Sequence, residues 1–345
     1  MKETTIIIPN YNGIQYLEKC ICSLIKGESK EENGMESDKL HALFDILVVD
    51  NGSSDGSEQV VEKLKKERAE HFPHIGLHQI RLDHNTGFCG AVNIGIREAK
   101  TPYVLLLNND TEVLPGFVSS LTRTIASDRK LFSVSAKMLS MKEPEKMDDA
   151  GDFYCALGWA FARGKGGSAS DYAEPAEIFA ACGGAAIYRR EVFEQLGLLD
   201  ENHFAYLEDI DVAYRAQIHG YRNQYEPSAA VLHAGSATTG SAHNPFKVRL
   251  SARNSVYLAY KNMPLLQLLL NLPFLLCGHF IKLLYFAKKH LAGPYLKGLG
   301  QGITLCLSKE GRAHKIPFRL NHLLHYVRIQ CMLWWNIVRR LGFFH

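Results

Sequence analysis

The chain has 345 residues, of which 46% are hydrophobic and 22% are charged. This balance is typical of globular proteins and excludes a largely disordered chain, and the length indicates one large domain with an appendage, or two domains. Residues 1–260 carry 27 Lys and Arg against 35 Asp and Glu, whereas residues 261–345 carry 12 Lys and Arg and one acid, Glu310. The basic, apolar tail, but not the acidic body, is therefore expected to meet an anionic surface, a membrane or a nucleic acid.

Eight cysteines are spread along the chain without a CxxC pair or dense spacing. This usage favours reduced thiols over a disulfide framework or a zinc site. The first ten residues contain an apolar run of only three isoleucines, which is far shorter than the apolar part of an export signal. We therefore expect the catalytic part of the protein to be cytoplasmic.

Apolar strands and helices alternate through residues 1–130. The expected strands are 4–9, 44–49, 75–82 and 103–107, and the expected helices are 13–25 (with Asn12 as its N-cap), 57–68 and 88–99. Residues 27–42 are polar and are expected to form a surface loop. Continuous apolar strands separated by helices predict an α/β fold, with a mostly parallel sheet flanked by helices. Ligands bind beyond the carboxyl ends of such strands, so the polar residues there are candidates for a site.

The pattern becomes looser from residue 131 to about 240. Short strands are expected at 132–138, 179–188 and 229–232, and a helix at 209–219. No obvious linker interrupts this stretch. We therefore expect residues 1–260 to form one catalytic domain, followed by a basic, apolar and helical C-terminal region at 261–345.

Two stretches of the C-terminal region are candidates for membrane contact. Residues 265–287 are strongly apolar, with expected breaks at Pro273 and Gly278, and residues 320–344 are amphipathic and rich in aromatic and cationic side chains. The first stretch is long enough to span a bilayer, but its proline, Lys282 and the aromatic-cationic tail fit an interfacial helix better. A soluble packing helix is the remaining alternative.

Asp50 ends the second expected strand and is followed by a run of Gly, Asn, Asp and Ser. Turn formation explains the run. A carboxylate at the end of an apolar strand, however, faces the ligand edge, where it could accept a hydrogen bond from a base N–H or a ribose hydroxyl. The glycine-containing segment 85–95 could let phosphate approach a helix N-terminus, or could serve close helix–sheet packing. It matches neither GxGxxG nor a Walker A motif, which argues against a dehydrogenase or an ATPase.

Asn108, Asn109 and Asp110 directly follow an apolar strand. Amide and carboxylate oxygens, together with diphosphate oxygens, suit a hard divalent cation such as Mg²⁺ or Mn²⁺, although a simple turn or helix cap is the alternative. His233 ends a later strand and could complete the cation site with an imidazole. A lone histidine is also often structural.

Glu208 and Asp209 begin an expected helix. Acids in a first turn complement the helix dipole, and Asp211 can pair with Arg215 one turn later, so these acids also have a structural explanation. Asp209 lies on a different face from Asp211 and is the candidate general base. Neighbouring carboxylates raise each other's proton affinity, which moves a base toward a useful pKa.

Several of these segments are motifs in a fixed order: IIIPNYNG at 6–13, VVDNGSSDGS at 48–57, NTGFCGAVNIGI at 85–96, LLNNDTEV at 106–113, DAG at 149–151, CGGAAIYRREVFEQLGLLDENHFAYLEDIDVAYRAQIHGYR at 182–222 and VLHAGSATTG at 231–240. Together they resemble the motifs of the inverting GT-A glycosyltransferases of family 2. More narrowly, they are similar to the rhamnosyltransferase-like subgroup that extends cell-surface polysaccharides. The resemblance covers residues 1–260 and implies the GT-A, Rossmann-like fold.

The resemblance also implies roles for the matching residues. Contacts to the nucleotide sugar would come from the strand ends and glycine-containing loops: Pro9, Asn10, Asn12, Asp50, Gly87, Asn93, Asn108, Asn109, Gly184 and Ala185. Asp110 and His233 would hold Mg²⁺ or Mn²⁺. Asn108 replaces the first acid of the family's DxD motif, which leaves Asp110 as its only carboxylate. Asp209, paired with Glu208, would be the catalytic base.

The implied reaction is inverting transfer of one sugar to a hydroxyl of a lipid-linked or cell-surface glycan. Deoxythymidine diphosphate rhamnose is the first choice of donor and a UDP-hexose is the alternative. The QxxRW sequence of processive synthases is absent, which favours transfer of a single residue. The protein would work at the inner face of the cell membrane, against an anionic surface, and no nucleic acid is expected as partner. A sugar nucleotidyltransferase and a non-catalytic membrane scaffold are the rival classes, and the oligomeric state stays open.

Overall fold

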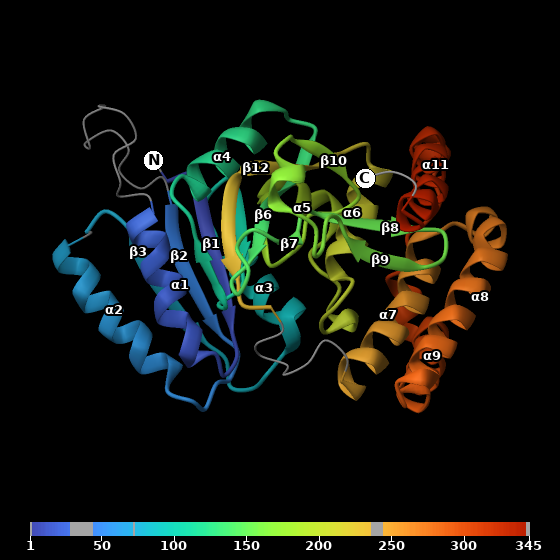
Figure 1. Ribbon diagram of the computed structural model, residues 1–345, viewed down its shortest axis with the longest axis horizontal. Helices are drawn as coiled ribbons and strands as arrows, with labels where there is room; N and C mark the ends of the chain where they lie inside the picture. The colour runs from blue at the N-terminus through green and yellow to red at the C-terminus, as the bar shows by residue number, and fades with distance from the viewer. Residues whose placement is uncertain (1, 28–43, 72, 236–243, 343–345) are drawn as a thin grey trace.

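A computed structural model describes residues 2–27, 44–71, 73–235 and 244–342 (Figure 1). The surface loop expected at 27–42 lies outside these residues, except for Gly27, which ends the first helix. Within the described chain, ten strands form a central sheet in the order β10-β12-β6-β11-β4-β1-β2-β3, with β5 beside β12 and β7 beside β6, and β8 pairs with β9 separately. The strands are β1 (Thr4–Asn10), β2 (Phe44–Asp50), β3 (Gly76–Arg81), β4 (Tyr103–Leu107), β5 (Thr111–Val113), β6 (Leu131–Ser140), β7 (Met147–Asp149), β8 (Asp152–Cys155), β9 (Trp159–Ala162), β10 (Ala176–Ile178), β11 (Ala185–Arg189) and β12 (Arg222–His233).

The N-terminal half of the sheet is parallel. β1 lies between β2 and β4 and is parallel to both, and β3 extends the sheet beyond β2 in the same direction. The apolar side chains of β1, β2 and β4 are buried, which is why these strands read as continuous apolar runs. β6 and β12 are parallel to each other, whereas β11 runs antiparallel to its neighbours β4 and β6. The expected α/β fold with a mostly parallel sheet is confirmed.

Helices cover both faces of this sheet. One apolar core contains Leu17, Val61 and Leu121 from α1, α2 and α4. A second core contains side chains from α3, α5 and α6, including Val92 and Phe193. These helices are α1 (Ile14–Gly27), α2 (Ser57–His71), α3 (Gly87–Glu98), α4 (Phe117–Ser127), α5 (Arg190–Leu196) and α6 (Glu208–Ile218). The two layers leave the carboxyl edge of the parallel strands free to carry polar side chains.

The start of α1 differs from the sequence-based prediction. Asn12 does not cap the helix, because its backbone is left-handed, with φ of 50°, and the N–H of Ile14 donates instead to Oδ2 of Asp55 at 2.9 Å. The side chain of Asn12 accepts from the N–H of Ser54 at 2.9 Å. Asn12 therefore ties the start of α1 to the loop after β2.

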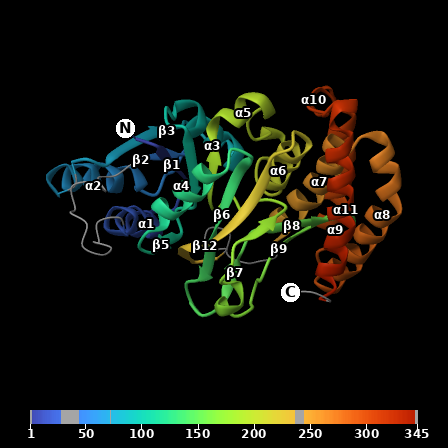
Figure 2. The same ribbon diagram turned by 90° about the horizontal axis from the view of Figure 1, so that it is seen from above.

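The C-terminal helices stand together at the end of the molecule opposite α2 (Figures 1 and 2). They are α7 (Pro245–Asn262), α8 (Leu265–Lys288), α9 (Ala292–Leu307), α10 (Lys309–Ala313) and α11 (Leu323–Arg340). The expected division at residue 260 falls inside α7, whose Lys261 donates to Asp200 and Asp211 of the preceding part at 2.8 Å each. On α11, Asn336 donates to the carbonyl of Tyr154 at 2.9 Å. The C-terminal helices thus pack on the catalytic part and share its core.

α8 is one uninterrupted helix of 24 residues, so the breaks expected at Pro273 and Gly278 do not occur. Gly278 instead allows close packing, because an added Cβ would lie 2.1 Å from the carbonyl oxygen of Leu157. Nε1 of Trp159 donates to the carbonyl of Gly278 at 3.1 Å. Among the described residues, α8 is the one helix long and apolar enough to cross a membrane, and little of it is buried.

Candidate active site

Asn10, Asp50 and Asn109 form a hydrogen-bonded row at the carboxyl edge of the sheet. β1 and β2 end side by side, with Asn10 opposite Asp50. Nδ2 of Asn10 donates to Oδ1 of Asp50 at 3.2 Å, and Oδ1 of Asn10 accepts from Nδ2 of Asn109 at 2.7 Å. Pro9 precedes this row, and Asn12 follows it, exposed on the surface. Five of the residues expected to contact the nucleotide therefore lie together.

Gly87 lies against the loop that precedes α6. Its φ is 79°, and an added Cβ would lie 2.5 Å from the ring of Phe204 and 2.6 Å from its carbonyl oxygen. At Gly95, an added Cβ would lie 2.5 Å from Ile7 of β1. These contacts favour the packing explanation for the glycine-containing segment at 85–95.

Asn93 is also engaged by the protein itself. Its Nδ2 donates to the carbonyl of Leu199 and to Oε1 of Glu201, both at 2.9 Å, and its Oδ1 accepts from the N–H of Leu199 at 3.0 Å. The residue is buried in α3. These contacts argue against the expected place of Asn93 along the nucleotide sugar and give it a structural role, holding the chain ahead of α6.

Gly184 and Ala185 lie beside the end of β4. Ala185 pairs with Leu107 in the antiparallel ladder, and the N–H of Asn108 donates to the carbonyl of Gly184 at 2.8 Å. An added Cβ on Gly184 would lie 3.0 Å from Nδ2 of Asn108. Only a small residue at position 184 leaves room for the side chain of Asn108. Local packing alone therefore explains the glycine, and so does the expected contact with the substrate.

Asp110 and His233 are brought together from β5 and β12. The short strand β5, which begins directly after Asp110, pairs with the end of β12 and places Thr111 opposite His233. Nε2 of His233 lies 3.3 Å from Oδ1 of Asp110, and its Nδ1 lies 2.7 Å from Oδ2 of Asp148. Lys165 extends the row, with its Nζ 2.8 Å from Oδ1 of Asp148.

Opposite charges set the protonation of this row. Burial opposes protonation of His233, but the hydrogen bonds and charges of Asp110 and Asp148 outweigh it and raise the pKa of His233 to about 9. Burial likewise acts against ionised Asp148, but His233 and Lys165 lower its pKa to about 2. With a cation absent, the row therefore exists as an ion-paired chain at neutral pH.

The residues present fit a divalent cation. One carboxylate oxygen and one imidazole nitrogen face each other, and Asp148 stands behind the imidazole as carboxylates commonly do behind metal-bound histidines. A mixed oxygen and nitrogen donor set suits Mn²⁺ better than Mg²⁺, which prefers oxygen ligands alone.

Glu208 and Asp209 open α6. The Asp209 carboxylate accepts from the N–H of Ile210, 2.7 Å from Oδ1, and from the backbone of Gly183. Burial raises the pKa of Asp209, and burial together with the charge of Asp209 raises the pKa of Glu208 to about 8. A carboxylate whose proton affinity is raised by its surroundings suits a general base.

Asp211 has the structural role that its spacing indicates. Its Oδ2 lies 2.9 Å from Nη2 of Arg215, one turn later, and 2.8 Å from Nζ of Lys261. Nδ2 of Asn262 donates to its Oδ1 at 2.8 Å. Asp211 is fully buried, so the pairing with Arg215 predicted from the sequence is confirmed within a larger buried network.

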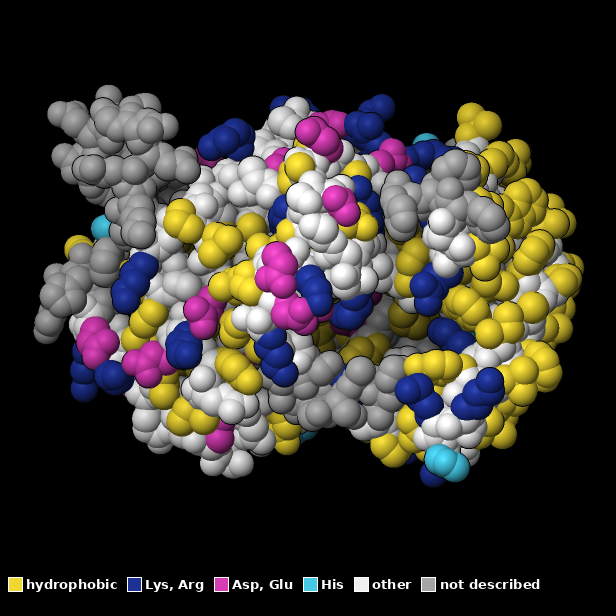
Figure 3. Space-filling view, viewed as in Figure 1, with side chains coloured by type: hydrophobic (Ala, Val, Ile, Leu, Met, Phe, Trp, Pro, Cys, Tyr) yellow, Lys and Arg dark blue, Asp and Glu magenta, His cyan; other side chains and the backbone are white. Residues whose placement is uncertain are grey.

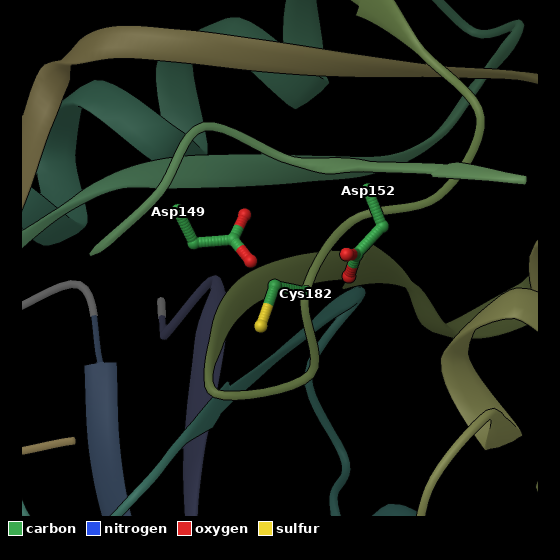
Figure 4. A group of neighbouring side chains, drawn as sticks. All are labelled: Asp149, Asp152 and Cys182. Atoms are coloured by element: carbon green, nitrogen blue, oxygen red, sulfur yellow. The ribbon is translucent and has the colours of Figure 1, made fainter. Parts of the chain in front are cut away.

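Asp149, Asp152 and Cys182 form a further group, and after burial the charge of Asp209 is among the causes that raise their pKa values. Their ligand atoms lie within 4.8 Å of one another, and the two carboxylates point toward each other (Figure 4). Burial and the charge of Asp148 raise the pKa of Asp149 to about 7, and burial and Asp149 raise that of Asp152. The DAG motif is the one sequence signal for this group.

Continuous contacts join the expected site residues. The backbone of Gly183 binds the Asp209 carboxylate. The residue after Gly183 is Gly184, whose carbonyl accepts from the N–H of Asn108, and Asn108 lies two positions before Asp110. Asn109, between them, binds Asn10 and through it Asp50. These contacts link Asp50, Asp110 and Asp209 to one another at the carboxyl edge of the sheet.

Residues 5–197 match the family model described as glycosyl transferase family 2, which is more than half of the chain. The chain is a family 2 glycosyltransferase. This family membership excludes the two rival classes, a sugar nucleotidyltransferase and a non-catalytic membrane scaffold. Asp209, His233 and α7 lie beyond the matched residues.

Two curated relatives of this glycosyltransferase are named for lipid-linked acceptors. It is 26% identical over 222 residues to the N-acetylglucosaminyl-diphospho-decaprenol L-rhamnosyltransferase of Mycobacterium tuberculosis, covering 56% of this chain and 68% of the relative. It is 28% identical over 123 residues to the GalNAc(5)-diNAcBac-PP-undecaprenol beta-1,3-glucosyltransferase of Campylobacter jejuni, covering 35% of this chain and 34% of the relative. The chain thus spans about two thirds of the first relative and about one third of the second.

Solved structures agree on the fold of the glycosyltransferase. S. aureus TarS 1–349, in complex with UDP-GlcNAc, superposes with a TM-score of 0.58 at 18% identity, covering 96% of this chain and 88% of that one. GalNAc-T7 with UDP, GalNAc and Mn²⁺ has a TM-score of 0.56 at 19% identity, covering 76% of this chain and 48% of that one. At these identities the likeness shows the GT-A fold alone.

Proposed function

We propose that this glycosyltransferase moves one sugar, with inversion, from a nucleotide diphosphate donor to a hydroxyl of a lipid-linked saccharide. One observation carries the proposal. The pair of Asp110 and His233 is joined to Asp209 through Asn108 and the turn at 183–184, which supports a reaction that uses a cation and a carboxylate base together.

Each side chain has a defined task in this reaction. Asp209 accepts the proton of the acceptor hydroxyl, whose oxygen forms a bond to C1 of the donor sugar from the face opposite the diphosphate. The bond from C1 to the diphosphate oxygen breaks, and the diphosphate leaves with the electron pair. Asp110 and His233 would hold a divalent cation that neutralises the charge growing on the diphosphate. Asp50 and Asn10 would orient the nucleoside.

Rhamnose, supplied as deoxythymidine diphosphate rhamnose, is the proposed donor sugar. The mycobacterial rhamnosyltransferase supports it, because that match covers more than half of this chain. A UDP-hexose is the second candidate, which the shorter match to the Campylobacter glucosyltransferase favours. Both relatives are named for lipid diphosphate acceptors, and this supports an acceptor of the same class here.

We further propose that the C-terminal helices rest on the cytoplasmic face of an anionic membrane. Large apolar side chains are exposed along α8, α9 and α11, and they gather at this end of the molecule (Figure 3). Polar contacts occupy the opposite side of α8, where Asn271 and Gln330 of α11 exchange two hydrogen bonds of 2.8 Å. α8 therefore packs against its neighbours along one side, and cationic residues surround it. This arrangement fits a helix that lies in the membrane interface better than a helix that crosses the bilayer.

A donor panel tests the proposed function. Purified full-length protein with Mn²⁺ is mixed with deoxythymidine diphosphate rhamnose, UDP-glucose and UDP-N-acetylglucosamine, and the melting temperature and nucleotide diphosphate release are measured. We expect the rhamnose donor to give the largest shift and the fastest release. A larger response to either UDP-sugar would replace the donor, and no response to any of them would overturn the proposed function.

A further inference from the structure

The loop that leads into Asp209 has an unusual backbone. Five non-glycine residues within the described ranges have positive φ, and three of them are Phe204 at 61°, Tyr206 at 72° and Leu207 at 69°. L-amino acids with side chains rarely adopt this conformation, and it persists only where the surroundings hold it in place. Leu207 is the residue directly before α6. The position and orientation of Asp209 therefore depend on the contacts that fix residues 203–207.

Asn254 of α7 holds this loop. Its Nδ2 lies 2.9 Å from the carbonyl oxygens of His203 and Ala205 and 2.8 Å from that of Tyr206. Its side chain is fully buried, and its Oδ1 accepts from Nε of Arg253 at 2.9 Å. Buried carbonyl groups need donors, and the two N–H bonds of this amide are shared among carbonyl groups on both sides of Phe204 and of Tyr206.

The other side of the loop is fixed by α3. The carbonyl of Phe204 accepts from the N–H of Cys89 at 3.1 Å, and Phe204 packs on Gly87. Asp211 then donates its N–H to the carbonyl of Leu207 at 2.9 Å, which begins the hydrogen bonding of α6. The loop is thus held between α3 and α7, with α6 and Asp209 at its exit.

We infer that Asn254 is a positioning residue for the base, setting the place of Asp209 through the loop at 203–207. The polar atoms of its side chain bind protein groups, so it acts through the loop and not on the substrate. The inference rests on the proposed role of Asp209. It reaches beyond the family match, which ends at residue 197.

Kinetics of Asn254→Ala test the inference, with Asn254→Ser, which keeps one donor group, as a second variant should the first fail to fold. We expect kcat to fall at least 10-fold while the KM for the donor changes less than 2-fold. Ser255→Ala is the matched control on the same helix, because the hydroxyl of Ser255 donates within its own helix, to the carbonyl of Ala252, and to no other group in the described ranges. It should keep kcat within 2-fold. An unchanged kcat in a folded Asn254 variant would overturn the inference, and so would a loss of donor binding equal to the loss of kcat.

A double variant separates positioning from a general structural loss. If Asn254 acts only through the base, then Asp209→Asn with Asn254→Ala should be no slower than Asp209→Asn alone. Losses that multiply would overturn the inference. Activity retained in Asp209→Asn would instead remove the base from the proposed function, whatever Asn254→Ala does, so the two failures are distinguishable.

Discussion

Nδ1 of His233 lies 2.7 Å from Oδ2 of Asp148. When His233 is neutral, this contact keeps the ring proton on Nδ1 and leaves the lone pair of Nε2 facing Asp110. Asp148 therefore selects the tautomer that a cation site needs. The sequence motifs give Asp148 no role, yet it is closer to His233, at 2.7 Å, than Asp110 is, at 3.3 Å.

Asp148→Ala should weaken Mn²⁺ binding about 10–100-fold, because the imidazole loses the carboxylate that orients it. Mn²⁺ titration followed by electron paramagnetic resonance measures the affinity directly. Asp171→Ala, at an exposed aspartate, is the control and should leave affinity unchanged. Equal affinity in the Asp148 and Asp171 variants would contradict the orienting role, and full activity in EDTA would remove the cation from the mechanism.

The two neighbouring acids at the start of α6 should respond unequally to loss of charge. Asp209→Asn should lower kcat about 10²–10⁴-fold with donor binding largely intact, because the proton acceptor is gone. Glu208→Gln should lose at least 10-fold less at pH 7, since Glu208, with its pKa near 8, is already neutral there. Single-turnover transfer and donor titration report the two quantities. The assignment of the base fails if Glu208→Gln is the more damaging change, or if Asp209→Asn loses binding and transfer equally.

Lys261 should matter strongly for stability. Its ammonium group is buried between Asp200 and Asp211, 2.8 Å from each, so Lys261→Met leaves two carboxylates facing each other in the core. We expect the free energy of unfolding in urea to fall by about 3–5 kcal/mol. Lys63→Met, which removes an exposed pair with Glu18, should change the free energy of unfolding far less. Similar losses in both variants would contradict the network's role.

The same buried network predicts how the stability of the folded protein changes as the pH falls. Burial works against ionised Asp200, but Lys261 lowers its pKa from 3.8 to about 2. A carboxyl with a lower pKa in the folded state binds fewer protons than in the unfolded state, so its contribution is present above pH 4 and is lost as the pH falls toward 2. The melting temperature should therefore drop over this window, and less steeply in Lys261→Met. A drop of equal slope in the variant would assign the acid sensitivity to other groups.

Membrane contact should depend on the exposed apolar side chains of the C-terminal helices. Leu266 and Leu324 are each 80% exposed. Leu266→Asp with Leu324→Asp removes apolar area and adds negative charge, so binding to vesicles containing anionic lipid should fall clearly in a sedimentation assay. Gln59→Asp adds charge on α2, far from this end, and should bind as before. If the unmodified protein stays in the supernatant, the membrane proposal loses its support.

Strand ends and ordered motifs were enough to predict the parallel sheet and the residues at its edge. Residues such as Asn10, Asp50 and Asp110 could be placed because parallel strands end at one edge, whatever the exact register. β12 was harder, since only 229–232 reads as a strand. The full strand runs from Arg222 to His233 and passes Pro227 with a register shift between Glu226 and Ala230. A local pattern cannot show a bulge that only the neighbouring strand makes stable.

The contacts missed from the sequence are the long-range polar ones. Asn93 lies in a helix that opens with glycines, and nothing local shows that its amide is used by residues more than 100 positions away. Asn254 is similar, since its loop lies about 50 residues earlier in the chain. Such pairings depend on how the helices are stacked. The periodicity of a helix shows which face is apolar, but it does not show which backbone carbonyls that face will meet.

The place of α7 has a consequence for exchanging parts among related enzymes. The helix follows the family match by nearly fifty residues, yet Arg253 and Asn254 provide donors for the turn ahead of Asp209. A chimera cut between Asp209 and the start of α7 would join the proposed base from one parent to a support from another. Recombination that keeps activity should therefore take place after Asn262, and the C-terminal helices beyond that point are the natural parts to exchange when a different acceptor or membrane is wanted.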